Sequence, residues 1–310
     1  MGITSVIRLI NSGGYEMSSN RTVLKNMGNF IAFTGPSLLA FSCVLLIPFI
    51  YGIFLSFTNY SPVTGSMDYV GLSNFAKVFT DKQFLQQFIK TIWYVFYSTL
   101  LCNLVAFTLA AFLTSNIKGQ NILRGGFFTP NLIGGIILGY IWKFIFSNVV
   151  TLIGKNTGIE WLSTSFLTDP NRAIWAMIIV TVWQYAGYLM LIYIAGFVAI
   201  PRDIQEAASI DGATGLGKLF RVTIPLMVPS FIICFFISLS RGFMAYDLNL
   251  SLTNGQPYGS TQLASMHVYQ KAFQSYKYGI GQAEAIILFI VVTVVAVSQV
   301  LLTKRFEVEA

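Results

Sequence analysis

Charged side chains are scarce in this sequence. Only 10% of its 310 residues are Asp, Glu, Lys or Arg, whereas a soluble globular domain carries about 25%. Hydrophobic residues make up 55% of the chain, and the mean hydropathy is +0.68. This composition excludes a soluble fold, and the long apolar runs predict helical membrane spans of about 20 residues each.

Metal-binding and catalytic side chains are also scarce. Cys43, Cys102 and Cys234 all fall in apolar runs, which favours small buried side chains over a disulfide framework or a metal site. The only histidine, His267, has no second His or Cys nearby in the sequence. Glu284, at the start of the last apolar run, has no obvious acid–base partner, and no nucleophile motif is present. We therefore expect no metal site and no enzyme activity.

Acidic residues are missing from the centres of the apolar runs, and the chain shows no internal repeat, low-complexity tract or additional soluble domain. An ion-driven secondary transporter would be expected to have both buried acids and an inverted repeat. The net charge of +7 does not indicate nucleic acid as a partner. In a membrane protein, surplus Lys and Arg usually reflect orientation and contact with anionic lipid.

Six apolar runs predict an all-α integral membrane protein with six transmembrane helices. The predicted spans cover residues 31–57, 89–114, 126–147, 173–199, 222–246 and 283–303. The polar segments between them include two long loops, 58–87 and 247–281. A basic segment, 1–30, precedes one membrane domain, 31–303, and a short tail, 304–310, follows it.

Basic residues predict the orientation of these spans. With both termini in the cytoplasm, the short inner loops and tails hold more Lys and Arg per residue than the longer outer loops, as the positive-inside rule requires. The inner basic residues would be Arg8, Arg21, Lys25, Lys118, Arg124, Arg202, Lys218, Arg221, Lys304 and Arg305. The segment 201–221, between the fourth and fifth spans, is therefore predicted to face the cytoplasm.

Segment 201–221 is the most informative polar interruption. Pro201 can begin a short helix, Asp203 and Glu206 favour its first turns, and Gly212 ends it. An exposed acidic helix between two spans would offer a docking element to a soluble partner. Glu206 could pair with basic or amide groups there, and Gly212 permits a sharp turn after the helix.

The same segment resembles the EAA loop of ABC-importer permeases. The resemblance rests on Glu206-Ala207-Ala208, Asp211-Gly212-Ala213, Phe220 and Thr223-Ile224-Pro225-Leu226. Ile224 departs mildly from the family, which usually has Leu there. The resemblance implies a type I ABC importer permease fold, in which this loop is a coupling helix that docks in a cleft of the ATPase subunit. The implied coupling residues are Glu206, Ala207, Ala208, Asp211 and Gly212. Asp211 could cap the turn or the second helical piece that follows it, or its role could be purely structural.

A partial nucleotide-binding motif overlaps this loop. Residues 212–218 match the first seven positions of a P-loop, but Leu219 replaces the Ser or Thr that would hold Mg²⁺. The segment also follows a predicted helix and not a strand. We interpret the match as accidental and expect no cofactor in this chain, with ATP and Mg²⁺ bound by a partner ATPase.

Polar residues within the spans predict a translocation pathway, because burying them in lipid is costly. Gln184, Tyr185 and Tyr188 share one helix face. Gly135 and Gly139 allow close helix packing. A cavity lined by such residues suits a neutral polyol. Alternatively, the tyrosines are packing residues and Arg241 extends outward or pairs with Asp247.

The resemblance refines this prediction. By position relative to the EAA loop, these helices resemble the substrate-lining helices of maltose-type permeases. The implied substrate-binding residues are Asn131, Gln184, Tyr185, Tyr188, Ser238, Arg241, Gly242 and Ala245. The residue types at Arg241 and Ala245 depart from the best-known member, so the identity of the sugar does not transfer.

Two further segments, Tyr69–Phe75 and Thr253–Pro257, resemble loops of the carbohydrate branch of the family. That branch implies a permease subunit importing a di- or oligosaccharide by alternating access, in a bacterial cell membrane. Its implied partners are a second permease, two cytoplasmic ATPases and an external substrate-binding protein. The alternatives are an ABC permease for a non-sugar solute, an ion-coupled secondary transporter and an intramembrane enzyme.

Overall fold

The computed structural model describes residues 32–115 and 117–306. The predicted segment 1–30 and residues 307–310 lie outside this part. The chain divides into two units, Met1–Leu55 and Ser56–Ala310. The first unit contributes one apolar helical span, Ala32–Ser56, which includes a π-helical turn, Ser42–Leu46, and helix α2, Ile47–Ser56. This span confirms the first predicted one.

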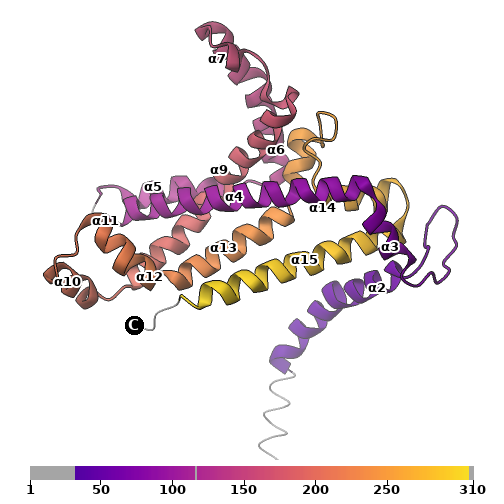
Figure 1. Ribbon diagram of the computed structural model, residues 1–310, viewed down its shortest axis with the longest axis horizontal. Coiled ribbons are helices and arrows are strands. Elements are labelled where there is room, and N and C mark those ends of the chain that lie inside the picture. The colour runs from indigo at the N-terminus through magenta and orange to yellow at the C-terminus, as the bar shows by residue number, and fades with distance from the viewer. Residues whose placement is uncertain (1–31, 116, 307–310) are drawn as a thin grey trace, which may run out of the picture. The chain divides into compact units, whose positions relative to one another are not determined.

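Four long helices of the second unit run side by side (Figure 1). They are α4 (Lys82–Thr114), α9 (Pro170–Ala199), α13 (Val228–Phe243) and α15 (Tyr278–Lys304). Helix α4 packs along α9 and α13, and α13 also packs on α15. Asp81 and Asp169 immediately precede α4 and α9 and cap them. Each carboxylate accepts hydrogen bonds from two backbone N–H groups of the first turn, which have no partner within the helix.

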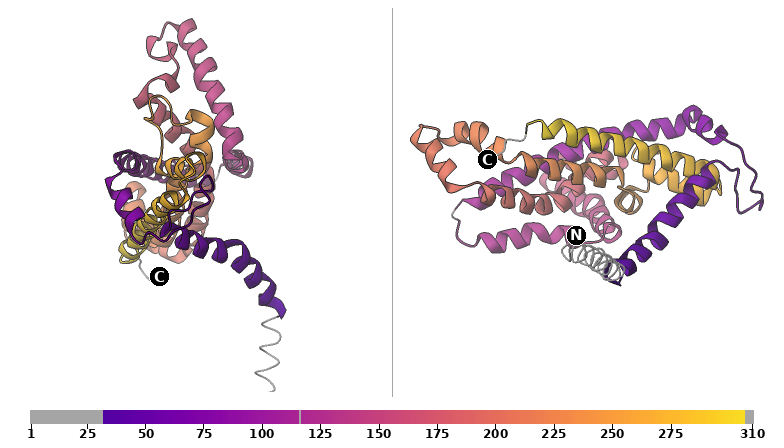
Figure 2. Two further views of the ribbon diagram at one scale, coloured as in Figure 1. Left: turned by 90° about the vertical axis from the view of Figure 1, so that its right-hand side faces the viewer. Right: turned by 90° about the horizontal axis from the view of Figure 1, so that it is seen from below.

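The third apolar run is broken and does not form the single predicted span 126–147. It contains α5 (Gln120–Phe128), a 3₁₀ turn (Thr129–Leu132), α6 (Gly135–Phe144), a π turn (Ile145–Val149) and α7 (Val150–Thr157). Pro130 lies in the 3₁₀ turn and Gly134 is extended, so the helix cannot continue through them. The membrane-length helix is Gly135–Thr157, which projects away from the bundle (Figure 1 and Figure 2). Short helices α8 (Glu160–Ser163) and η4 (Phe166–Thr168) connect it to α9.

The fifth run, predicted as the span 222–246, is bent. Its first part holds α11 (Gly215–Lys218), a π turn (Leu219–Thr223) and α12 (Ile224–Leu226). This part makes an angle of 73° with α13. Pro225 and Pro229 flank the bend and cannot donate backbone hydrogen bonds to the preceding turn. Within the described residues there are five membrane-length apolar helices, or six if the bent pair is one span, in agreement with the six predicted.

The two predicted outer loops are more ordered than expected. Segment 58–87 contains α3 (Ser73–Thr80) and the first turns of α4. Segment 247–281 contains a π turn (Asn249–Thr253), α14 (Ala264–Tyr269), a second π turn (Gln270–Gln274) and the start of α15. Asn249 is fully buried, where its amide group donates to the Thr261 carbonyl at 2.9 Å and accepts from the Leu263 N–H at 3.1 Å. One polar side chain thus satisfies backbone groups that would otherwise need water.

Candidate functional site

The EAA loop forms the helix that the sequence predicts. Helix α10 (Arg202–Ile210) begins directly after Pro201, and Asp211 follows its last turn. The N–H of Asp211 donates to the Ala207 carbonyl at 3.0 Å. Gly212 then adopts a φ of +80°, which a residue with a side chain rarely tolerates. Thr214, and not Asp211, precedes α11, so the Asp211 side chain does not cap the second helical piece.

The predicted coupling residues lie on the surface. Glu206, Ala207, Asp211 and Gly212 are exposed, and Ala208 is half-buried. Among the described residues, neither Glu206 nor Asp211 forms an ion pair. The loop therefore presents the carboxylates of Asp203, Glu206 and Asp211 without an ion pair among the described residues, beside small side chains that let another surface approach the helix closely.

Large apolar side chains are also exposed around this helix. Ile210 is 86% exposed, Leu216 71% and Phe220 64%. Exposed apolar groups gathered beside unpaired charges are typical of a protein-binding surface. The loop and the C-terminal end of α15 lie at the same end of the bundle (Figure 1).

The P-loop-like segment has no phosphate-binding geometry. Its lysine, Lys218, donates from Nζ to the Gln205 carbonyl at 2.9 Å and to the Ser209 hydroxyl at 3.0 Å. These bonds hold α11 against α10 and occupy the ammonium group. The segment follows a helix, where a P-loop requires a strand before it, which supports the interpretation of an accidental match.

Several of the predicted substrate-binding residues meet at a polar cavity of about 270 Å³ near the end of α13 that lies away from the EAA loop. Gln184, Tyr185, Arg241 and Ala245 contribute to its lining. The other lining residues are Tyr94, Gly135, Thr181, Met244, Tyr246, Asp247 and Leu248. We refer to this space as the polar cavity. It combines one cation, one carboxylate, one side-chain amide, one threonine hydroxyl and three tyrosines.

Arg241 is held at the polar cavity by two tyrosines of α9. The guanidinium carbon lies 4.7 Å from the ring centre of Tyr185 and 5.7 Å from that of Tyr188. These distances are in the range of cation–π contacts. Within the described residues Arg241 does not pair with Asp247, so the pairing considered from the sequence is not formed. Its N–H groups can therefore meet a ligand in the cavity.

Other predicted substrate-binding residues serve packing or lie apart from the cavity. The Ser238 hydroxyl accepts from the Asn103 amide at 2.9 Å, and Tyr193 donates to the same amide at 2.7 Å, which joins α4, α9 and α13. Gly242 packs against Val95 of α4. Asn131 is outside the cavity lining, although its side-chain oxygen is buried and has no hydrogen-bond partner among the described residues.

Tyr94 and Thr181 are among the lining residues that the sequence interpretation missed. Their hydroxyl groups hydrogen-bond each other at 2.6 Å across α4 and α9. Thr181 lies one helical turn before Gln184, so the polar face of α9 could have been extended to it. Tyr94 shares a face of α4 with Thr91 and Ser98, so the same helical spacing could have indicated it as well.

Comparison with known proteins identifies the family. The family of binding-protein-dependent transport system inner membrane components matches residues 103–308. The probable starch degradation products transport system permease protein of Thermoanaerobacterium thermosulfurigenes is 40% identical over 293 residues, which cover 94% of this chain and 100% of that protein. The chain belongs to this family. It is thus a multi-pass membrane permease subunit of a binding-protein-dependent transport system, and not an enzyme.

Further similarities agree with this assignment. The multiple sugar-binding transport system permease protein of Streptococcus mutans is 35% identical, and the match covers 84% of this permease and 90% of that protein. The solved structure of a bacterial ABC transporter involved in the import of the acidic polysaccharide alginate matches with a TM-score of 0.78 and 21% identity. That match covers 92% of this permease and 99% of the matched chain of the alginate transporter, and it confirms the ABC-importer permease fold.

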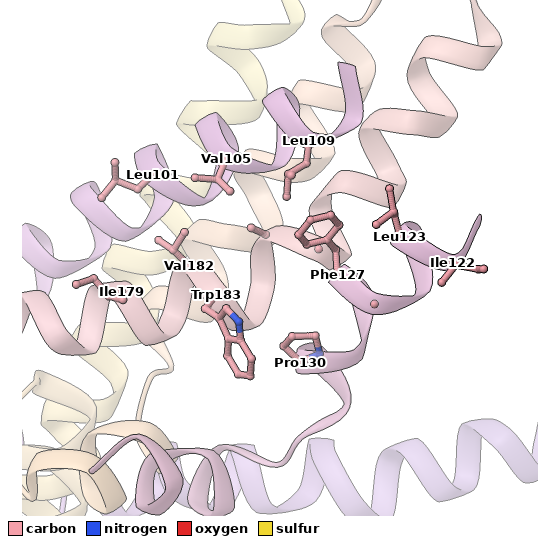
Figure 3. Close-up of a pocket in the computed structure, with 13 residues that line it drawn as sticks. Leu101, Val105, Leu109, Ile122, Leu123, Phe127, Pro130, Ile179, Val182 and Trp183 are labelled. Atoms are coloured by element: carbon pink, nitrogen blue, oxygen red, sulfur yellow. The ribbon is translucent and has the colours of Figure 1, made fainter. Parts of the chain in front are cut away.

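The permease also has a larger apolar pocket of about 840 Å³ between α4, α5 and α9 (Figure 3). Leu101, Leu109, Phe127 and Trp183 are among the side chains that point toward it. The side chains that line this pocket are almost all apolar. The pocket therefore suits acyl chains or another helix better than it suits a hydroxyl-rich solute.

The structure corrects the interpretation of Glu284 as a residue without a partner. Helix α15 begins at Tyr278 and not near residue 283, so Glu284 lies in its second turn. There it is fully buried, with Oε1 3.4 Å from Nε2 of His267. Gly281 has no side chain, which lets the start of α15 approach Ala272 closely. Sequence distance hid this pair, because the two residues come from different helices.

Proposed function

We propose that this permease forms the translocation path for a di- or oligosaccharide in an ATP-driven importer. The observation that carries the proposal is one mostly helical segment of chain that joins an exposed docking loop to the polar cavity. The EAA loop continues through α11 and α12 into α13, and α13 carries Arg241 at the cavity. Movement of the loop can therefore reach the cavity through a single segment of chain.

The bend between α12 and α13 supports this role. The 73° angle, flanked by two prolines, lies between the surface part of the segment and its membrane-spanning part. A partner that moves α10 and α11 would rotate the bent segment about this point. Such a change gives alternating access when ATP binding favours one orientation and hydrolysis restores the other.

A carbohydrate is the best-supported substrate class. Relatives at 40% and 35% identity are named for starch degradation products and for multiple sugars. Tyr185 and Gln184 supply an aromatic ring and an amide at the polar cavity, which are suited to stacking on a sugar ring and to hydrogen bonding with its hydroxyl groups. Arg241 would donate to ring or hydroxyl oxygens.

The assembly would contain a second permease, two ATPase subunits and an external binding protein, in a bacterial inner membrane with both termini in the cytoplasm. Glu206, Ala207, Ala208, Asp211 and Gly212 would form the ATPase-docking surface. Ile210, Leu216 and Phe220 would be covered in the complex, since their present exposure is costly in water. ATP and Mg²⁺ would bind to the ATPases.

The test is Glu206→Ala in the co-expressed complex, reconstituted in vesicles. We expect assembled complexes that lose most substrate uptake together with substrate-stimulated ATP hydrolysis, because the helix would lose its charged contact. Glu160→Ala, at an exposed glutamate of α8, is the matched control and should leave both activities unchanged. Uptake that is independent of ATP and indifferent to Glu206 would contradict the proposal.

A further inference from the structure

Three side chains that can bind metal ions meet at the end of the bundle opposite α10. Asp81 precedes α4, His267 lies on α14, and Glu284 lies in the second turn of α15. One ligand atom from each lies within 4.8 Å of the other two. The Nε2 atom of His267 is 3.4 Å from Oε1 of Glu284.

Two of the three side chains are buried among apolar residues. His267 is 4% exposed and Glu284 is 0% exposed. Val78, Phe84, Ala264 and Ala283 form the surrounding apolar cluster, and the ring centre of Phe84 lies 5.9 Å from that of the imidazole. A carboxyl group in such surroundings is costly unless it is well paired.

The pairing of these groups within the described chain is incomplete. Neither Nε2 of His267 nor either carboxylate oxygen of Glu284 makes a hydrogen bond with a described residue. The 3.4 Å separation is within ion-pair distance but is longer than a good N–H···O hydrogen bond, which spans about 2.7–3.2 Å. The two buried side chains therefore lie close together and carry polar atoms that have no hydrogen-bond partner among the described residues.

We propose that Asp81, His267 and Glu284 form a binding site for a divalent transition-metal ion such as Zn²⁺. In a tetrahedral Zn²⁺ site with bonds of about 2.1 Å, neighbouring ligand atoms lie about 3.4 Å apart, which is the separation of the His267 and Glu284 atoms. Imidazole and carboxylate are ligands that Zn²⁺ accepts, and a water molecule would complete the coordination. The charges of two carboxylates balance the charge of the ion.

Asp81 would supply the third ligand and the route to solvent. Its Oδ1 atom caps α4 by accepting from the N–H groups of Gln83 and Phe84, while Oδ2 accepts from Lys271 Nζ at 2.7 Å. Burial alone would raise the pKa of this carboxyl, but Lys271 and the two backbone N–H groups together hold the pKa below its ordinary value. Asp81 is therefore ionised, and its side chain is 23% exposed.

Lys271 and the metal ion would compete for Oδ2 of Asp81. The Lys271 side chain is 18% exposed, and its long aliphatic stem would let the ammonium group turn into solvent when the ion binds. Binding would then fasten α14 to the ends of α4 and α15 that lie opposite the EAA loop. The competition makes a specific prediction, because removing the charge of Lys271 should strengthen metal binding.

The experiment uses the full chain with its co-expressed partner subunits in nanodiscs, after treatment with a chelator. Co²⁺ is titrated and its visible absorption recorded, and Zn²⁺ is then used to displace it. We compare the unaltered protein with His267→Gln, Glu284→Gln and Lys271→Gln, and with Glu160→Gln as an exposed control. Unlike a stability measurement, the Co²⁺ spectrum reports directly on ligand atoms.

We expect the unaltered protein to bind one Co²⁺ per permease with a tetrahedral spectrum. Binding should be at least about tenfold weaker in His267→Gln and Glu284→Gln. It should be unchanged in Glu160→Gln and tighter in Lys271→Gln. Equal binding in the unaltered protein and Glu284→Gln, or no binding in either, would overturn the proposal. If the buried substitutions prevent folding, Lys271→Gln decides, since unchanged Zn²⁺ affinity there contradicts a site that includes Asp81.

Discussion

Segments 201–226 and 247–278 are both polar interruptions between apolar runs of the sequence, yet the structure uses their polar groups differently. In 201–226 the charged side chains of α10 point into solvent, and large apolar side chains are exposed beside them. In 247–278 the polar side chains of Asn249, Gln262 and His267 are buried. The first segment is organised to meet another molecule, whereas the second is organised to hold its own chain together.

The hydrogen bonds of the two segments show the same difference. Gln87 donates to Gln262 at 2.8 Å and Thr91 accepts from the Ala264 N–H at 2.8 Å, which ties segment 247–278 to α4. In the EAA loop, the side-chain bonds from Lys218 connect only neighbouring parts of the same loop. We therefore expect segment 247–278 to unfold only together with the bundle. The EAA loop should unfold locally, while the bundle stays folded.

The largest effect should come from disturbing the contact between α6 and the π turn at residues 249–253. A side chain at position 139 would overlap Ser251 and the backbone of Leu252, so Gly139→Leu should destabilise the protein by about 3 kcal/mol or more. Gly134→Ala is the matched control, because open space surrounds Gly134 and its φ of −60° suits alanine. The melting temperature of the purified complex in detergent measures both, and equal values would contradict this packing.

The next largest effect should come from Asn249→Leu. The substitution leaves the buried Thr261 carbonyl and Leu263 N–H without partners, and each unsatisfied group costs about 1–3 kcal/mol. Gln256→Ala, at an exposed residue of the same segment, should change stability little. Thermal unfolding measures the stability of both variants. If Asn249→Leu were as stable as Gln256→Ala, the contrast between the two polar segments would be weakened.

A smaller effect is expected for substrate recognition. Arg241→Gln removes the cation from the polar cavity and should raise the KM of uptake about tenfold, equivalent to about 1.4 kcal/mol, with little change in melting temperature. Arg172→Gln is the matched control, because Arg172 also lies over two aromatic rings, Trp161 and Phe166, but away from the cavity. A similar rise in KM for Arg172→Gln would contradict a role specific to the cavity.

The smallest effect should come from the EAA loop itself. Ser209→Ala removes one of the two hydrogen bonds of Lys218 at an exposed site and should change global stability by less than about 0.5 kcal/mol. Hydrogen exchange of residues 202–218 should nevertheless become faster. A large fall in melting temperature would show that the loop is as firmly integrated as segment 247–278.

Interpretation from the sequence was accurate where a local signal was sufficient. The apolar runs predicted membrane-length helices, and Pro201 and Gly212 predicted the bounds of α10. The bounds of the third span and the bend in the fifth were not predicted, because hydropathy does not report a change of direction. Pro130 and Pro225 were present as signals there, but proline also occurs within membrane helices that continue.

The polar cavity was predicted in part. Gln184 and Tyr185 of α9, and Arg241 and Ala245 from the chain after the bend, were expected from the sequence and all four line the cavity. Tyr94 and Thr181 are added by the structure. Ser238 and Gly242 are placed against α4, where they serve packing. The face of α13 that meets α4 is set by how the two helices pack together. The sequence of one helix does not contain that information.

By itself the sequence determined that this is a helical membrane protein, where its spans lie approximately, and that an exposed acidic helix with the pattern of ABC-importer permeases interrupts them. These properties follow from local hydropathy and backbone preference. Only the tertiary structure decided that Arg241 lies over Tyr185, that Asn249 is buried, and that His267 meets Glu284 and Asp81. These contacts join residues from different helices, and packing sets their geometry.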